Sequence, residues 1–310
     1  MKRSGLGKLI FGVLLVAVML CALPFAALAA NDFSVLGDTT GYTYTNGVLT
    51  FTKGGDYTIS MSGTAATNNQ IKINAASIYN SSKQLKLTLS GIKMERDGGY
   101  SSSDRSIEFI NTNSSNKIQV ELVIDGENTI TNKGYRGYCL YQDNNSASAS
   151  IKVSGSGILT LSNPNRENPA SNVGDIFYTD NFMLDSDNVQ LVLNNVSIYA
   201  KNKIEINKGS LKIDQKLKTA SRELHCLSAD GEFIMSGGTL TANTNGTKSA
   251  CIYVSDANTA GAGIKITGGT LDLTSYAWSR GALTLNLSTQ NEATKALLIE
   301  GGNYEYILHI

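Results

Sequence analysis

Residues 264–273 read IKITGGTLDL, and residues 233–242 read FIMSGGTLTA. In both stretches, alternating apolar and polar residues flank a glycine turn, which is typical of a strand, a tight turn and a second strand. The unit recurs along the chain in eight copies: LKLTLSGIKM (85–94), ELVIDGENTI (121–130), IKVSGSGILTL (151–161), LVLNNVSI (191–198), IEINKGSLKI (204–213), the two quoted first, and LLIEGGNYEY (297–306). Such internal repetition indicates a repeat architecture.

A shorter motif of three slots precedes most of these turns. Its clear copies are Cys139-Leu140-Tyr141, Ile176-Phe177-Tyr178, Ser197-Ile198-Tyr199, Cys226-Leu227-Ser228 and Cys251-Ile252-Tyr253. Ser77-Ile78-Tyr79 and Glu108-Phe109-Ile110 fit as earlier, weaker copies. The copies are unequally spaced, which indicates constant coils joined by loops of variable length.

These patterns predict an all-β fold, a right-handed parallel β-helix (β-solenoid) of about eight coils. No stretch keeps a helical period long enough for the crossover helices of an ordinary parallel sheet. Antiparallel sandwiches do not usually repeat one motif eight times. Coils stacked about 4.8 Å apart would pair their backbones and bury continuous apolar columns. We expect residues 40–310 to form this single domain, with residues 31–39 as a lead-in segment.

The first thirty residues predict a signal peptide. Lys2, Arg3 and Lys8 precede a long apolar run, and Ala27-Leu28-Ala29 offers the small residues that a signal peptidase needs. We expect cleavage near residue 30 and a secreted protein without a membrane segment. An uncleaved membrane anchor is the alternative, because the apolar run is just long enough to span a bilayer.

The charge and histidine content exclude several classes of function. The chain has 26 basic and 26 acidic residues, and loss of residues 1–30, which hold three basic and no acidic residues, changes the formal charge from 0 to −3. A nucleic-acid-binding protein needs a basic excess instead. His225 and His309 are the only histidines, which disfavours a zinc site or a histidine-based triad. We expect a monomer.

Strand alternation predicts that the middle slot of the short motif faces the core and that both flanking slots face outward. One flanking slot holds cysteines, for which we expect a structural role: Cys139, Cys226 and Cys251. The other holds Tyr141, Tyr178, Tyr199 and Tyr253. Such rings can stack on sugar rings while their hydroxyls bond sugar hydroxyls. Burial under an overlying loop is the alternative.

Cationic residues precede the same strands: Arg105, Arg136, Arg222, Lys248 and Arg280. Beside tyrosines they would suit an anionic polymer such as a polyuronate, because arginine binds carboxylates bidentately. A solubilising corner is the alternative. A loop at 276–280 combines arginine with Tyr276 and Trp278, the single tryptophan, which is our best candidate for a sugar platform. We therefore predict carbohydrate binding by Tyr141, Tyr178, Tyr253, Tyr276, Trp278, Arg136 and Arg280.

The Gly-Gly-Thr-Leu turns at 237–240 and 268–271, each preceded by short apolar-aromatic rungs, resemble those of a known family. This family comprises the secreted bacterial carbohydrate-binding domains that have a parallel β-helix fold related to that of pectate lyases. The resemblance covers most of residues 40–310. It implies a non-catalytic binder of cell-wall or plant polysaccharides, with calcium ions between its coils.

The acidic residues depart from that family. Paired aspartates are common in its later coils, whereas this sequence has no Asp-Asp dipeptide. The densest acidic group is Asp180, Asp185 and Asp187, which a loop could fold around one calcium ion. Solvated turn residues are the alternative.

A secreted, non-catalytic polysaccharide-binding protein is the function that these features favour. A polysaccharide lyase or hydrolase on the same fold is one alternative, but no motif brings the necessary carboxylates or cations together. A surface adhesin that binds a protein is the other, because solenoids offer long interaction surfaces. Open exposure of the tyrosines would favour the first over the adhesin.

Overall fold

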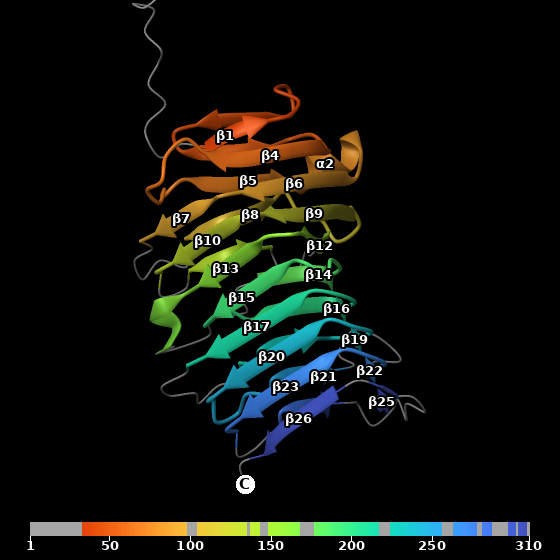
Figure 1. The fold of residues 1–310 in the computed structure, drawn as a ribbon. Helices are drawn as coiled ribbons and strands as arrows, with labels where there is room; N and C mark the ends of the chain where they lie inside the picture. Colours follow the sequence, from red (N-terminus) through yellow and green to blue (C-terminus); the bar gives the residue numbers. More distant parts are fainter. Residues whose placement is uncertain are drawn as a thin grey trace, which may run out of the picture.

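The computed structural model describes residues 33–97, 104–134, 137–142, 148–167, 177–216, 224–255, 263–277, 281–286, 297–301 and 303–308. These residues form an elongated stack of parallel strands, with the N-terminal strands at one end and β26 at the other (Figure 1). The prediction of an all-β fold with a parallel β-solenoid is confirmed. The predicted signal peptide lies outside the described residues. Among the described residues, no helix is long and apolar enough to cross a membrane.

Each coil contributes strands to three faces, and the strands of each face pair in parallel. The first face contains β4 (Gly55–Met61), β6 (Gln84–Ser90), β9 (Ile118–Asp125), β12 (Ala149–Gly155), the second halves of β14 (Phe177–Leu184) and β16 (Ile198–Ile206), β19 (Glu232–Met235), β22 (Gly263–Ile266) and β25 (Leu297–Ile299). The second face contains β7 (Lys93–Arg96), β10 (Glu127–Asn132), β13 (Ile158–Ser162), β15 (Gln190–Asn194), β17 (Ser210–Gln215), β20 (Thr239–Thr244), β23 (Thr270–Ser275) and β26 (Asn303–Leu308).

The third face contains β3 (Val48–Phe51), β5 (Gln70–Asn74), β8 (Arg105–Ile110), β11 (Tyr138–Tyr141), the first halves of β14 and β16, β18 (Leu227–Ala229), β21 (Ile252–Ser255) and β24 (Leu283–Asn286). Two short helical segments, α2 (Ala75–Ser81) and η2 (Pro164–Glu167), lie in the connections.

The first coil carries an antiparallel cap. Strand β1 (Phe33–Leu36) pairs with β4, and β2 (Tyr42–Thr45) pairs with β3. The lead-in segment therefore contributes a strand to the solenoid end. β1 and β2 therefore cover the backbone of the first coil, which would otherwise offer an open edge to another chain.

The core consists of apolar columns that run along the solenoid. One of them joins the first-face strands through residues that are each no more than 1% exposed: Leu87, Leu122, Val153, Leu184, Ile206, Met235 and Ile266. Burying each such side chain contributes about 1.5–3 kcal/mol. Alternating apolar residues thus fix both the register and the stacking.

A buried polar ladder follows the last positions of the second face. Its members are Asn132, Asn163, Asn195, Gln215, Thr244 and Ser275, all at most 6% exposed. The Asn163 amide donates to the carbonyl oxygens of Gly134 and Gly137 at 3.1 and 3.0 Å. The Gln215 amide similarly donates to the His225 carbonyl at 3.1 Å. The ladder therefore anchors the loops that lead to the third face.

Three of the sequence alignments are wrong. LVLNNVSI crosses from β15 to β16, the corner between the second and third faces, and the true copy is FMLDSDNVQLVL (182–193). Ser77-Ile78-Tyr79 lies in α2, which begins because Asn74 Oδ1 caps it by accepting from the Ser77 N–H at 3.1 Å. Leu140 pairs with Ile107, so the earlier copy of the short motif is Ser106-Ile107-Glu108 rather than Glu108-Phe109-Ile110.

The prediction that the cysteines face outward is also wrong. Cys139, Cys226 and Cys251 are each 0% exposed. The Cys251 thiol donates to the carbonyl oxygens of Ala242 and Thr274 at 3.1 and 3.2 Å, on neighbouring second-face strands. The chain bends around the interior at this corner, so two consecutive side chains face inward and strict alternation fails.

Candidate functional site

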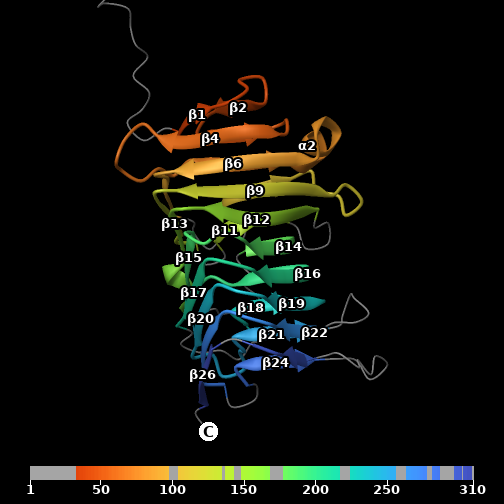
Figure 2. The same ribbon diagram turned by 45° about the vertical axis from the view of Figure 1, so that its right-hand side comes forward.

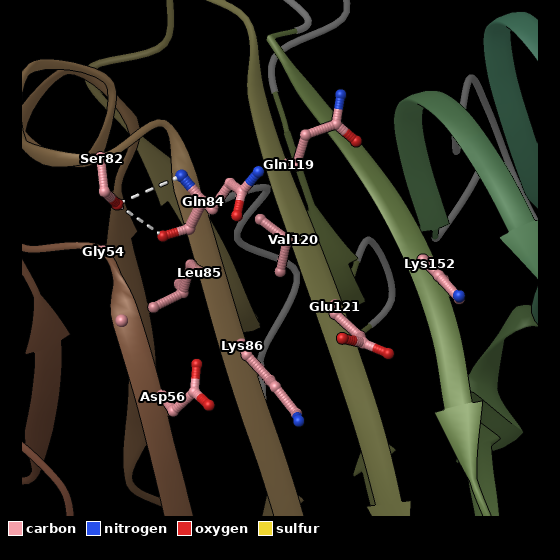
Figure 3. A pocket seen from close by; sticks show the side chains of 11 residues that line it. Gly54, Asp56, Ser82, Gln84, Leu85, Lys86, Gln119, Val120, Glu121 and Lys152 are labelled. Carbon is pink, nitrogen blue, oxygen red and sulfur yellow. Dashed lines mark hydrogen bonds between the residues drawn. The ribbon is translucent and has the colours of Figure 1, made fainter.

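An open groove of about 610 Å³ crosses the first face near the capped end. Its walls come from β4, β6, β9 and β12, which stack side by side below the cap, with α2 at one side (Figure 2). The charged residues in it are Asp56, Lys86, Glu121 and Lys152, which follow one another in register on these four strands. Figure 3 shows these four side chains on adjacent strands, with Gln84, Gln119 and Ser82 at the α2 end.

The floor of the groove on β4 lacks side chains at Gly54 and Gly55. A Cβ atom at Gly54 would lie 1.6 Å from Ser82 Oγ and 2.1 Å from the Gln84 carbonyl oxygen. Ser82 Oγ is held there by the Gln84 backbone, to which it donates at 2.8 Å. The close approach of the α2 end to β4 therefore requires glycine, and glycine leaves the groove recessed.

Several polar groups of the groove have no partner among the residues that the structure describes. Among the described residues, the side chains of Asp56, Lys86, Gln84 and Gln119 make no hydrogen bond or ion pair. Asp56 and Lys86 face the same way on paired strands without forming a salt bridge. These donors and acceptors are thus available to a ligand.

Two lysines of the first face form ion pairs with carboxylates. The Lys152 ammonium pairs with Asp185 at 3.0 Å, and the Lys203 ammonium pairs with Glu205 at 2.7 Å. Burial raises the pKa of Glu205, but hydrogen bonds from Lys203 and Asn207 outweigh it and hold this pKa below its ordinary value. Asp56 and Lys86 therefore differ from these paired residues of the same face.

The predicted tyrosine column lies on the third face. Tyr178 pairs with Tyr199, Tyr199 with Ser228, and Ser228 with Tyr253. Tyr141 belongs to the same column, because Leu140 pairs with Phe177. These tyrosines are half-buried and point outward, as predicted from the third slot of the short motif.

The faces of these rings contact neighbouring side chains. The Tyr178 and Tyr199 rings stack with centroids 4.6 Å apart, and the Tyr253 ring stacks on His225 at 4.1 Å. The Arg105 guanidinium lies 3.6 Å from the centroid of the Tyr141 ring. The column therefore presents ring edges and hydroxyls outward, rather than flat ring faces.

Buried polar contacts hold the column in place. The Tyr199 hydroxyl donates to Asp230, which also accepts from the Ser255 hydroxyl at 3.0 Å. Asp230 is 8% exposed. Ser228 interrupts the tyrosines, and His225, on the same coil as Ser228, supplies a ring that stacks on Tyr253. The column is a cross-linked structural ladder.

The other predicted sugar-binding residues lie at or beyond the edge of the described structure. Trp278, Arg136 and Arg280 fall outside the described residues. Tyr276 is described and is 55% exposed. Arg105, from the predicted cationic row, pairs in register with Tyr138 and hydrogen-bonds Glu108.

The structure does not bring the acidic trio together. The Asp180 carboxylate, which is 5% exposed, pairs with the Lys117 ammonium at 2.5 Å and accepts from the Asn202 amide at 2.9 Å. Asp185 pairs with Lys152, and Asp187 pairs with Lys208 at 3.3 Å. No group of three acidic, histidine or cysteine side chains in the described part of the chain could hold a metal ion.

The sequence analysis missed the groove. Part of its signal was present in the repeats themselves, because the outward position of the first three copies holds Lys86, Glu121 and Lys152, with alternating sign. What the copies do not reveal is that the first of these residues, Lys86, pairs with Asp56, which lies before the first recognised copy.

Comparison with known proteins adds no family to this geometry. A scan against protein-family models, a search of curated proteins and a search of solved structures each found no significant match.

Proposed function

We propose that this protein is a secreted, non-catalytic polysaccharide-binding protein and that the groove on its first face holds the glycan. The observation that carries the proposal is the set of unpartnered polar side chains in an open groove that crosses four coils. The resemblance to carbohydrate-binding β-helix domains supports the proposal only at the level of the fold. Fold alone does not specify function.

The chemistry of the groove suits sugar hydroxyls. A carboxamide both donates and accepts hydrogen bonds, as a sugar hydroxyl does. Gln84 and Gln119 pair in register, so their amides repeat at the strand spacing of about 4.8 Å. A groove across several strands therefore offers a repeating set of contacts to a repeating ligand.

Affinity electrophoresis of the purified protein tests the proposal. The gels contain xylan, mixed-linkage β-glucan, polygalacturonate or a mucin-type glycan, each with and without calcium. Retention by one polymer is expected, without chain shortening. The double variant Gln84→Ala/Gln119→Ala should weaken it about tenfold or more, because two hydrogen bonds of about 1 kcal/mol each are lost. Lys265→Ala is the matched control, because Lys265 lies in the same outward column but outside the groove. Equal retention of wild type and double variant would overturn the groove assignment, and retention by no polymer would favour the adhesin.

Glycoside hydrolysis on the same groove is a second candidate. Asp56 and Glu121 flank Lys86 on the two neighbouring strands, which places their backbones about 9.6 Å apart at the usual strand spacing. Inverting glycosidases use two carboxyl groups about 6.5–9.5 Å apart. Release of reducing ends by wild type, lost in both Asp56→Asn and Glu121→Gln, would establish an enzyme in place of a binding module.

A further inference from the structure

The arrangement of charges in the groove specifies the class of glycan. Lys86 lies between Asp56 and Glu121 on neighbouring paired strands, and Lys152 follows Glu121. The groove thus contains two cations and two anions, and each cation has a carboxylate on an adjacent strand. A row of this kind has no net charge with which to attract a polyanion.

The second cation is already neutralised. The Lys152 ammonium lies 3.0 Å from an Asp185 carboxylate oxygen. Glu121 accepts a hydrogen bond from the Ser154 hydroxyl at 2.7 Å, which fixes its carboxylate at the groove without removing its charge. Lys86 is therefore the one cation of the groove that has no partner among the described residues.

A sugar carboxylate at Lys86 would meet two protein carboxylates. Strands in a sheet lie about 4.8 Å apart, so a carboxylate that reaches Lys86 comes close to both Asp56 and Glu121. Like charges at such distances repel at a partly desolvated surface. The lining also contains no arginine, the side chain whose planar fork matches a carboxylate.

We infer that the groove takes a neutral polysaccharide and rejects its uronate counterpart, an inference that rests on the proposed function of the same groove. Gln84, Gln119, Asp56 and Lys86 each hydrogen-bond hydroxyl groups. Asp56 and Glu121 act as the specificity-determining residues, because they exclude a ligand that carries carboxylates. This differs from the expectation of a polyuronate, which depended on arginines outside the described residues.

The test compares matched pairs of polymers with one backbone. Soluble β-glucan and its C6-carboxylated derivative form one pair, and methyl-esterified and de-esterified polygalacturonan form the other. At low salt the neutral member should bind at least about tenfold more tightly, and the difference should shrink as salt screens the repulsion. The double variant Asp56→Asn/Glu121→Gln should gain affinity for the carboxylated member. Glu205→Gln, on the same face but outside the groove, should not.

Tighter binding of the carboxylated member by the wild-type protein would overturn the inference while leaving polysaccharide binding intact. The inference would also be overturned if Asp56→Asn/Glu121→Gln kept the wild-type melting temperature and the wild-type preference for the neutral polymer. Retention of no polymer by either protein would instead overturn the proposed function, and the inference would fail with it.

Discussion

The groove on the first face and the tyrosine column on the third face both consist of polar side chains that point outward from stacked strands. In the column each group is satisfied by the next one, through stacked rings and the bonds that converge on Asp230. In the groove, Asp56, Lys86 and two glutamines have no partner in the described part of the chain. A regular row of aromatic residues can thus stabilise a solenoid, while a less regular row of polar residues remains able to bind a ligand.

The largest expected effect follows from removing the acceptor on which the column converges. Asp230→Ala leaves the donors of Tyr199 and Ser255 without their buried partner, which should lower the free energy of unfolding by about 3 kcal/mol. Urea denaturation followed by circular dichroism measures it. Ser255→Ala, which removes one donor rather than the shared acceptor, should cost less. A neutral Asp230→Ala would show that the column does not stabilise the coils.

A smaller effect is expected from removing one ring of the stack. Tyr178→Leu keeps apolar bulk but loses the stacking on Tyr199, and should cost about 1 kcal/mol of unfolding free energy. The same variant should bind polysaccharide as the wild type does. Reduced affinity with unchanged stability would reverse the comparison and return the sugar platform to the column. Tyr276→Leu is the companion variant, because the Tyr276 ring is 55% exposed and lies outside the stacked rings.

The fold could be predicted from sequence because its cause is local. Alternation with period two recurs from coil to coil, most coils have a glycine turn, and stacking follows from burying the apolar positions. The misaligned copy LVLNNVSI shows the limit of that reasoning. Asn195 adopts a positive φ of 55°, so the Asn-Asn turn imitates a glycine turn at a different corner. The true copy, FMLDSDNVQLVL, turns without glycine and was not recognised.

The sites were harder to predict, because they depend on contacts between coils. The outward direction of Tyr178 follows from strand alternation, but the covering of its ring by Tyr199 requires the register of two strands. Nothing near Asp180 in the sequence shows that Lys117 neutralises it from another coil. The groove likewise exists only because Asp56, Lys86 and Glu121 come into register from distant parts of the chain.

Stability measured as a function of pH tests the ion pair between Lys203 and Glu205 on the first face. The lowered pKa of Glu205 means that its carboxylate stabilises the folded protein above the ordinary value of 4.5, and that this contribution is lost as the pH falls through the lower folded pKa. The free energy of unfolding of the wild type should exceed that of Glu205→Gln by about 0.5 kcal/mol at pH 7, and this difference should vanish at low pH. A difference that stays constant from pH 7 to pH 3 would contradict the ion pair with Lys203.

The smallest effect on stability is expected in the groove itself. Lys86 has no partner in the described part of the chain, so Lys86→Ala should change the free energy of unfolding by no more than about 0.5 kcal/mol. The same change should weaken glycan retention several-fold, because the ammonium is the groove's unpaired donor. Lys152→Ala is the matched comparison, because the Lys152 ammonium is held by Asp185. This variant should lower the stability slightly and should weaken glycan retention less than Lys86→Ala does. If Lys86→Ala instead destabilised the protein and left retention unchanged, the groove would be a structural ladder like the column. The distinction between the two faces would then fail.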